Sequence, residues 1–342
     1  MPPAWQTALP GEIERAANLL RAGRLVVFPT ETVYGVGANA LDPEAVARIY
    51  AVKRRPATSP LIVHVASIEI AQALVEVWPE TADLLAKTFW PGPLTLVLTT
   101  ARVGTGASPV QAEQSSAALS SRATPISIPS IVTAGLPTVG LRMPAHPIAL
   151  ALLRAAGVPL AAPSANRFTE LSPTTADHVR HSLGTEVDLI LDGGPCSIGI
   201  ESTVISLATP TPTLLRPGAI SRADIESIIG PIATAQELST GAHPAPGMHP
   251  RHYSARTVLY LTQKGEVPGQ GQGIYLQLQQ PPSRANIAVI QMPQSAAAYA
   301  AALYEVLHQA DAKNYSWITI DLPPNTPEWE AVQDRLKRAA TK

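Results

Sequence analysis

Cysteine is almost absent from this sequence, and neither sign of charge is in excess. The single cysteine among 342 residues, Cys196, excludes an internal disulfide and any zinc site built from several cysteines. Because no histidine lies near it in the sequence, we interpret Cys196 as a small packed residue rather than a nucleophile. The formal net charge of -1 leaves no overall basic field that could drive strong non-specific binding of nucleic acids.

Targeting and membrane signals are also missing. The first 20 residues lack a basic start followed by an apolar core, so they do not form a signal peptide. The most apolar stretch, residues 147–163, contains Arg154, Gly157 and Pro159 and is therefore not expected to span a bilayer. We expect a soluble, cytoplasmic protein with no membrane association.

Common catalytic signatures do not occur. The sequence contains no GxxxxGK[ST] loop, no HExxH pair, no GxSxG elbow and no kinase signature. If the protein uses a nucleotide, it must therefore bind it through another architecture. His249 and His252 are three residues apart, but without a third ligand nearby they do not predict a metal site.

The length of the chain favours two domains, since single hydrophobic cores rarely grow beyond about 250–300 residues. We predict a first domain over residues 1–230 and a small Rossmann-like α/β domain over residues 256–342. Residues 231–255 combine prolines and glycines with little periodicity, which predicts a linker. Residues 102–130 are rich in Ala, Ser, Thr, Gln and Pro without a sustained period, which predicts a flexible insertion.

Hydrophobic periodicity predicts strands and helices mixed along the chain, which is typical of an α/β fold. After a first helix that Gly23 ends, helices are expected near residues 42–55, 80–89, 147–156, 174–182, 221–230, 295–312 and 327–339. Strands are expected near residues 25–28, 61–65, 94–98, 138–142, 159–161, 187–191, 203–207, 213–215, 258–261, 274–278, 287–292 and 317–322. In the strand at 61–65, alternation places Ile62 and His64 on one side, so His64 is expected to face a site.

A cluster of cations marks the end of the second predicted helix. Lys53, Arg54 and Arg55 precede Pro56, which stops the helix. They could simply complement the negative end of the helix dipole, an effect of about 0.3–1 kcal/mol for a surface cation. Polyphosphate recognition favours the same kind of cluster, so both interpretations remain open.

Two short motifs place small polar residues where predicted strands end. PTETVYG, residues 29–35, carries threonines and a glutamate at the edge where α/β proteins commonly bind ligands. APSAN, residues 162–166, follows a short apolar strand and offers side chains that both donate and accept hydrogen bonds. A plain hydrogen-bonded turn is the alternative for each motif.

Three further polar residues lie at the ends of predicted strands. Arg142 ends TVGLR, Arg216 ends TLLR and Ser202 begins STVIS. Taken singly, a surface salt bridge or a cap explains each of them equally well.

The motifs gain meaning from their order. PTETVYG, KRRP, PLIVHV, WPGPLT, VGLRMPAHP, PLAAPSAN, SPT, DGG, ESTV, LLRPG and PGMHPRHY resemble, in this order, the YrdC-domain family, in particular its longer two-domain threonylcarbamoyl-AMP synthases. The resemblance is close over residues 25–254 and loose over the last domain. It implies an α/β fold with a YrdC-like twisted sheet and a large concave pocket.

The resemblance also implies a reaction. L-Threonine, bicarbonate or CO2 and ATP would yield L-threonylcarbamoyl-AMP and pyrophosphate, with Mg2+ accompanying the nucleotide. The product would pass to a tRNA threonylcarbamoyl transferase, so the protein would meet tRNA only indirectly. Two other readings remain: a non-catalytic module that binds tRNA or double-stranded RNA, and a carbamoyltransferase that uses carbamoyl-phosphate.

The site residues follow from the same resemblance, motif by motif. Residues expected to bind the nucleotide are Lys53, Arg55, Thr138, Ser164, Asn166, Ser172, Arg216, Arg251 and His252. Residues expected to bind L-threonine are Thr30, His64, Arg142, Ser202 and Tyr253. Among them Lys53 and Arg55 would be catalytic by neutralising phosphate charge. The linker would cover the site like a lid, with Arg251 or His252 contacting the nucleotide.

Overall fold

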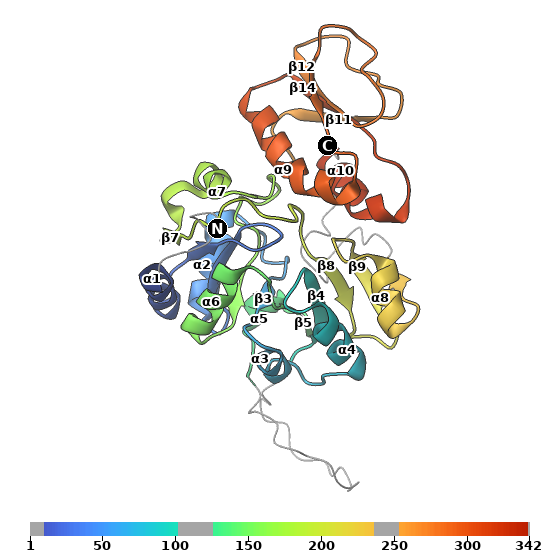
Figure 1. Cartoon of the computed structure of the whole chain (residues 1–342). Helices are drawn as coiled ribbons and strands as arrows, with labels where there is room; N and C mark the ends of the chain where they lie inside the picture. Colours follow the sequence, from blue (N-terminus) through green and yellow to red (C-terminus); the bar gives the residue numbers. More distant parts are fainter. Residues whose placement is uncertain (1–9, 102–125, 236–252, 341–342) are drawn as a thin grey trace, which may run out of the picture.

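The computed structural model describes residues 10–101, 126–235 and 253–340, which form two α/β domains stacked on each other (Figure 1). This confirms the predicted fold class. Within the described residues, no helix has the length and apolar character needed to cross a membrane.

The N-terminal domain is built on one mixed sheet of ten strands. Its order is β10-β9-β8-β4-β5-β3-β6-β2-β1-β7. β4 runs parallel to β8 and antiparallel to β5, while β3 runs parallel to β5. The strands are β1 (Val26–Phe28), β2 (Gly35–Asn39), β3 (Ile62–His64), β4 (Leu94–Thr99), β5 (Thr138–Arg142), β6 (Leu160–Ala161), β7 (Leu189–Ile190), β8 (Thr203–Ser206), β9 (Thr213–Arg216) and β10 (Ala233–Thr234).

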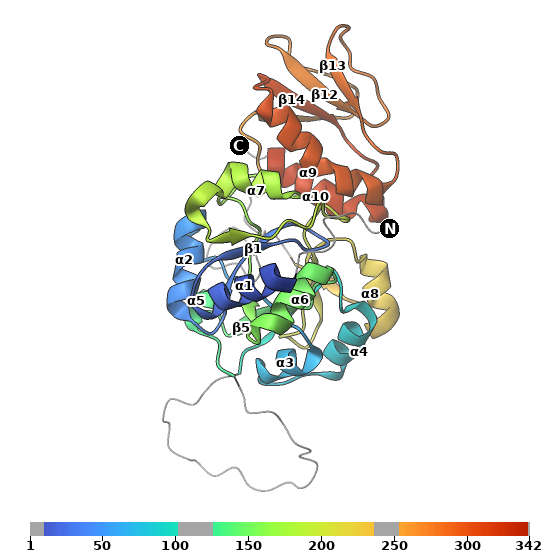
Figure 2. The ribbon, with the colours of Figure 1, turned by 60° about the vertical axis from the view of Figure 1, so that its left-hand side comes forward.

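Helices surround this sheet, and local capping sets where they begin and end. The side chain of Asp42 caps α2 by accepting bonds from two backbone amides, and the helix ends at Arg54 in the left-handed conformation, with φ 51°. α1 packs against α6 (Figure 2). The helices are α1 (Pro10–Arg21), α2 (Pro43–Lys53), α3 (Ile68–Ala73), α4 (Glu80–Phe89), α5 (Ser130–Thr133), α6 (Pro147–Ala156), α7 (Ala176–Leu183) and α8 (Arg222–Ile229).

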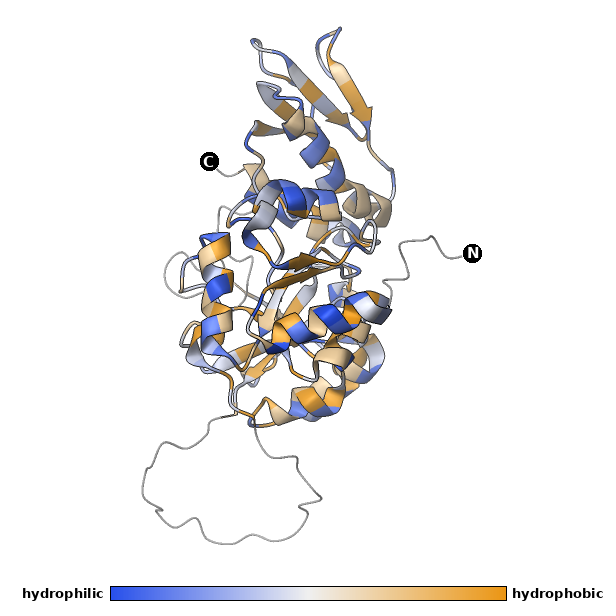
Figure 3. Cartoon of the chain, turned by 90° about the vertical axis from the view of Figure 1, so that its left-hand side faces the viewer, coloured by the Kyte–Doolittle hydropathy of each residue, from blue (hydrophilic) through white to orange (hydrophobic). Residues whose placement is uncertain are grey.

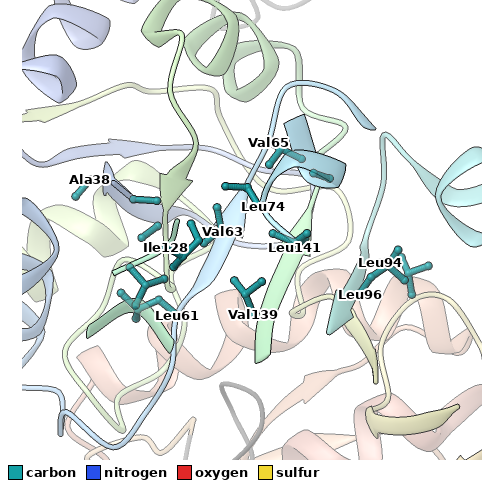
Figure 4. Packing of buried hydrophobic residues seen from close by; sticks show 14 of the residues in the cluster. Ala38, Leu61, Val63, Val65, Leu74, Leu94, Leu96, Ile128, Val139 and Leu141 are labelled. Carbon is teal, nitrogen blue, oxygen red and sulfur yellow. The ribbon is translucent and has the colours of Figure 1, made fainter. Parts of the chain in front are cut away.

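Alternation along β3 divides core from site, as the sequence predicts. Leu61, Val63 and Val65 point into the main core, where they pack near β5 (Figure 4). Ile62 and His64 take the opposite face and line a pocket. Figure 3 shows the same separation on a larger scale, with hydrophobic strands inside and mixed faces on the outer helices.

The C-terminal domain has a sheet of four parallel strands in the order β11-β14-β12-β13. Its helices α9 and α10 face the N-terminal domain (Figure 1). The elements are β11 (Val258–Thr262), β12 (Gly273–Gln277), β13 (Ala288–Gln291), α9 (Ala296–Ala312), β14 (Trp317–Asp321) and α10 (Glu330–Ala340).

Histidines meet where α7 touches α9. The rings of His178 and His308 stack with centroids 3.8 Å apart. The backbone amide of Thr174 donates to Nδ1 of His178, whose Nε2 lies 3.2 Å from a carboxylate oxygen of Glu305. These partners suit a neutral imidazole that carries its proton on Nε2, because protonating Nδ1 would break the bond from Thr174.

Most predicted elements are present within a few residues, and four were missed. β2 begins within the PTETVYG motif, α3 lies between β3 and α4, α5 precedes β5, and β10 pairs with β9 at the start of the predicted linker. The two residues of β10, Ala233 and Thr234, include no large apolar side chain, and the glycines of β2 conceal its alternation.

The last part of the predicted insertion is packed against the N-terminal domain. The amide of Ile126 donates to the carbonyl of Ala73, and Ile128 is buried in the main core. Residues 126–130 therefore belong to the globular part, since an apolar side chain buried there stabilises the contact. The rest of the insertion, 102–125, lies outside the described residues.

Candidate active site

A concave pocket lies where segments distant in sequence converge on the N-terminal domain. They are the β1–β2 turn, the loop after α2, β3, β5, the loop after β6, the start of β8, the end of β9 and the segment after residue 252. The residues that line it are Thr30, Thr32, Val33, Gly35, Arg55, Ile62, His64, Arg142, Ala162, Pro163, Ser164, Glu201, Ser202, Arg216 and Tyr253.

Many residues predicted from the sequence are thus brought together. Those on the pocket wall are Thr30, Arg55, His64, Arg142, Ser164, Ser202, Arg216 and Tyr253. Plain turns, surface salt bridges and caps therefore explain these residues poorly. Residues with such unrelated roles would not be expected to meet on one pocket wall.

Arg142 is held by Glu31, an acid in the turn that contributes Thr30 and Thr32 to the wall. Its guanidinium lies 2.6 Å from Glu31 and donates to the hydroxyl of Thr32 at 2.9 Å. The second oxygen of Glu31 accepts from the amide of Ala145 at 3.0 Å. Both partners of the ion pair are buried, so the pair fixes the direction of Arg142 within the pocket.

Arg216 is oriented by Ser202. Its Nε donates to the carbonyl of Ser202 at 3.0 Å, and a terminal nitrogen reaches the hydroxyl at 3.1 Å. That hydroxyl also shares a hydrogen bond of 2.8 Å with Thr95. The end of β9 is therefore tied to the start of β8, and a cation is fixed at the wall.

The three cations after α2 have different surroundings. Lys53 is 1% exposed and its ammonium donates to the carbonyls of Ser164, at 2.6 Å, and Asn166. Burial, followed by the charge of Arg55, lowers the pKa of Lys53 well below its usual range. Arg54 is exposed at the helix end.

Arg55 alone of these cations reaches the pocket wall. Its Nε and a terminal nitrogen donate to the carbonyls of Ser59 and Pro60, and its guanidinium lies 5.6 Å from the ring centre of Phe168. Burial lowers the pKa of Arg55 to about 10, so it remains charged at neutral pH. The hydrogen bonds to these two carbonyls fix the orientation of the guanidinium at the pocket wall.

Among the buried polar atoms that have no hydrogen-bond partner within the described residues are Nδ1 of His64 and Oδ1 of Asn166, both in segments that form or flank the pocket. The amide nitrogen of Asn166 is satisfied by the carbonyls of Arg167 and Glu170. Burial, with the charge of Arg142, lowers the pKa of His64 to about 3 and keeps the ring neutral. Because buried polar atoms are nearly always hydrogen-bonded, both atoms are candidates to meet a ligand.

The structure does not bring every predicted residue to the wall. Thr138 begins β5, about 13 Å along the strand from Arg142. Ser172 donates its hydroxyl proton to Glu201 at 2.5 Å, behind the wall. Arg251 and His252 lie outside the described residues.

Two carboxylates are not among the predicted site residues: Glu201, which lines the pocket, and Glu31, which the sequence indicated only as part of the PTETVYG motif. Each is adjacent to a predicted residue, yet its partner is remote: Glu31 pairs with Arg142 and Glu201 with Arg335. A signal for them exists only in the motifs TET and EST, which do not reveal the pairing.

The described residues contain no cluster of three or more His, Cys, Asp or Glu side chains that could hold a metal ion. The carboxylates of Glu31 and Glu201 already accept bonds from arginines. The residues therefore do not fit a magnesium ion held by the protein itself. Cys196 is buried, and burial raises the pKa of its thiol far above the usual value, as expected for a packed residue.

Comparison with known proteins gives two matching family models. The first, Sua5/YciO/YrdC, described as "Telomere recombination", matches residues 18–218. The second, described as "Threonylcarbamoyl-AMP synthase, C-terminal domain", matches residues 220–341. Together they span nearly all of the chain.

Curated relatives carry one name. The chain is 40% identical over 348 residues to a threonylcarbamoyl-AMP synthase of Bacillus subtilis, covering 96% of this chain and 93% of the relative. It is 46% identical over 246 residues to the enzyme of the same name from Pyrococcus abyssi, covering 71% of this chain and 65% of that one.

Solved structures agree over the whole length. P. abyssi Sua5 complexed with L-threonine matches with a TM-score of 0.83 and 36% identity, covering 97% of this chain and 95% of that one. A variant of that protein, in which alanines replace a histidine and a tyrosine, matches with a TM-score of 0.83 and 35% identity, covering 98% and 95%. The chain therefore belongs to the Sua5/YrdC family and has both domains of a threonylcarbamoyl-AMP synthase.

Proposed function

We propose that the pocket binds ATP and L-threonine together and, with bicarbonate or CO2, forms L-threonylcarbamoyl-AMP and pyrophosphate. The observation that carries this assignment is the meeting of Arg55, Arg142 and Arg216, from three distant segments, on one wall. A polyphosphate and a carboxylate are the ligands that such a wall would recognise. The P. abyssi structure with bound L-threonine supports the amino-acid half of the assignment.

The reaction needs no nucleophile from the protein. The amine of threonine takes up CO2 to give a carbamate, and a carbamate oxygen attacks the α-phosphorus of ATP. The bond from that phosphorus to the bridging oxygen breaks, and pyrophosphate leaves. Alignment and fixed positive charge lower the barrier of such a displacement, and Arg55 and Arg216 supply that charge. Mg2+ enters as part of the MgATP substrate, held by the phosphates.

The nucleotide is held through the loop at residues 162–166. Ser164 lies on the wall, and the unpartnered oxygen of Asn166 is suited to accept a hydrogen bond from the base or ribose. Lys53 acts on the same loop from behind through two backbone carbonyls. A contact between Lys53 and phosphate, as the sequence predicted, would require those bonds to break. We therefore assign to Lys53 the role of holding this loop in place. Ser172 acts through Glu201.

L-Threonine is assigned to the wall formed by Thr30, His64, Arg142 and Ser202. Arg142 supplies positive charge for the carboxylate, and Glu31 fixes its direction. The unpartnered Nδ1 of His64 offers one hydrogen bond to the substrate. Because His64 is neutral, it places no further positive charge in this part of the pocket. Arg142 then has no competitor for the carboxylate of the substrate.

We propose that the linker would cover the bound substrates, although its residues 236–252 lie outside the described residues. Its last described residues support this role, because Tyr253 is 1% exposed on the pocket wall and the amide of Ser254 donates to the carbonyl of Thr169. Closing the site would keep water from a labile adenylate. Arg251 or His252 would contact the nucleotide, and the product would go to a tRNA threonylcarbamoyl transferase in the cytoplasm.

The test is to incubate the pure protein with MgATP, bicarbonate and L-threonine and to look for the adenylate by mass spectrometry. Omitting each substrate in turn provides the controls. Product that appears only with carbamoyl-phosphate would identify a carbamoyltransferase instead. Tight binding of tRNA without any pyrophosphate release would indicate the non-catalytic module.

A further inference from the structure

Arg335 of α10 is a charged side chain with no exposure to solvent, and it crosses from the C-terminal domain to the N-terminal one. Its Nε donates to Glu201 at 2.7 Å, and a terminal nitrogen donates to the carbonyl of Pro217 at 3.0 Å. The remaining terminal nitrogen pairs with Asp334 at 2.7 Å. Every side of the guanidinium is thus engaged, and two of its partners belong to the other domain.

Glu201 connects this contact to the pocket. It lines the wall, and Tyr304 of α9 donates to its carboxylate at 3.2 Å while Ser172 donates at 2.5 Å. Although burial alone would raise it, the charges of Arg335 and Arg216 keep the pKa of Glu201 below its usual value. Glu201 is therefore an anion, and the residue after it is Ser202, which orients Arg216.

Tyr253 depends on the same two residues. Its ring lies 5.3 Å from the guanidinium of Arg335 and 5.9 Å from the ring of Tyr304. Its φ of 62° is a left-handed conformation that a bulky residue rarely adopts. Packing against α9 and α10 thus supports a strained residue that forms part of the pocket wall.

We propose that Arg335 and Tyr304 are positioning residues, through which the C-terminal domain holds Glu201 and Tyr253 in place and so completes the pocket. This inference rests on the function proposed above. Arg335, Tyr304 and Ser172 together engage both carboxylate oxygens of Glu201, and Arg335 shares with Arg216 the stabilisation of this anion. The charge of Arg216 is thereby left to serve the phosphates. Without Arg335, the buried carboxylate would have Arg216 as its main compensating charge, so it would turn toward Arg216 and displace the start of β8.

The variants that test this are Arg335→Met, Arg335→Met with Glu201→Gln, and Tyr304→Phe. The control is Arg284→Met, which removes an equal charge from an exposed loop of the same domain. Pyrophosphate release is measured as a function of ATP concentration, together with thermal unfolding of each full-length variant. A protein that has merely lost stability contains less active enzyme and keeps its KM, whereas a misplaced Arg216 raises the KM for ATP.

We expect Arg335→Met to lower kcat/KM about 100-fold, since small misplacements of site residues have effects of this size. Adding Glu201→Gln should raise kcat/KM at least about tenfold again, because the buried negative charge that lost its partner is removed. Tyr304→Phe removes one neutral hydrogen bond and should cost about fivefold. Arg284→Met should match the wild type.

The proposal is overturned if Arg335→Met keeps the wild-type KM, or if the double variant is no better than the single one. Should Arg335→Met fail to fold, Tyr304→Phe decides: wild-type kinetics in that variant refute the proposal. Failure of the proposed function looks different, because then the wild type itself forms no adenylate.

Discussion

The three neighbouring cations Lys53, Arg54 and Arg55 give the sharpest test of the site, because they have the same charge and different surroundings. Each is changed to methionine, which keeps an unbranched side chain and removes the charge. The buried ammonium of Lys53 holds two carbonyls of the loop 162–166, Arg54 is exposed, and Arg55 lies on the pocket wall. The three variants should therefore fail in three different ways.

The magnitudes follow from these contacts. Hydrogen bonds from a charged donor contribute about 1.5–3 kcal/mol each, so losing both bonds of Lys53 frees its loop substantially. Relief of the desolvation penalty of the buried ammonium, several kcal/mol in general, offsets the effect on overall stability. We expect Lys53→Met to change the free energy of unfolding by less than about 2 kcal/mol. Its affinity for ATP should nevertheless fall about 10- to 100-fold, since each factor of ten corresponds to 1.4 kcal/mol.

The assays are ATP titration by calorimetry, urea denaturation and pyrophosphate release at saturating substrates. Arg54→Met should stay within about twofold of the wild type, as expected for an exposed charge. Arg55→Met should turn over about 100-fold more slowly, the loss typical of a charge-stabilising group. If Lys53→Met and Arg54→Met have equal affinity for ATP, Lys53 does not hold the loop 162–166 in its binding conformation. Slow turnover of Lys53→Met with unchanged affinity would show instead that Lys53 contacts the phosphates directly.

Three further outcomes are expected. Asn166→Ala should weaken ATP binding about 5- to 30-fold in a titration, because it removes the neutral acceptor and two hydrogen bonds that hold the loop; unchanged affinity would contradict a nucleotide role. Burial and the neighbouring His308 lower the pKa of His178 to about 3. In the unfolded chain the pKa of His178 is near 6.5, so between pH 7 and pH 5 the unfolded state takes up a proton that the folded state does not. This group should therefore lower the free energy of unfolding by about 2 kcal/mol over that range. Urea denaturation of His178→Gln should show a smaller fall, and an equal one would refute the assignment. In the linker, His252→Ala with Tyr253→Ala should make product slowly and hydrolyse it, as mass spectrometry would detect; normal product formation would leave the linker as a tether.

Local chemistry allowed much of the fold to be predicted. Asp42 and Pro43 set the start of α2 within the sequence that forms it, and Ser221 with Asp224 forms the predicted capping box of α8. Such signals act over a few residues. They were sufficient to place most helices, whereas the short β10 produced no detectable pattern of its own.

For the site, reading along the chain yields a set of candidate residues and the order of their motifs. The alternation of 61–65 directed His64 away from the core, and the order of motifs gave the family, which the comparisons confirm. These inferences need only neighbouring residues or motifs read along the chain.

Which of these candidates share a wall, and what holds them there, depends on how the folded chain packs. Lys53 and Arg55 have different surroundings although only Arg54 lies between them, because Arg54 adopts a left-handed conformation at the helix end and turns the chain. Domain packing pairs Glu201 with Arg335 across 134 positions of sequence. Pairings over such distances leave no periodic pattern, because they are set by how strands and domains pack, and burial rather than residue type determines what each charge can do.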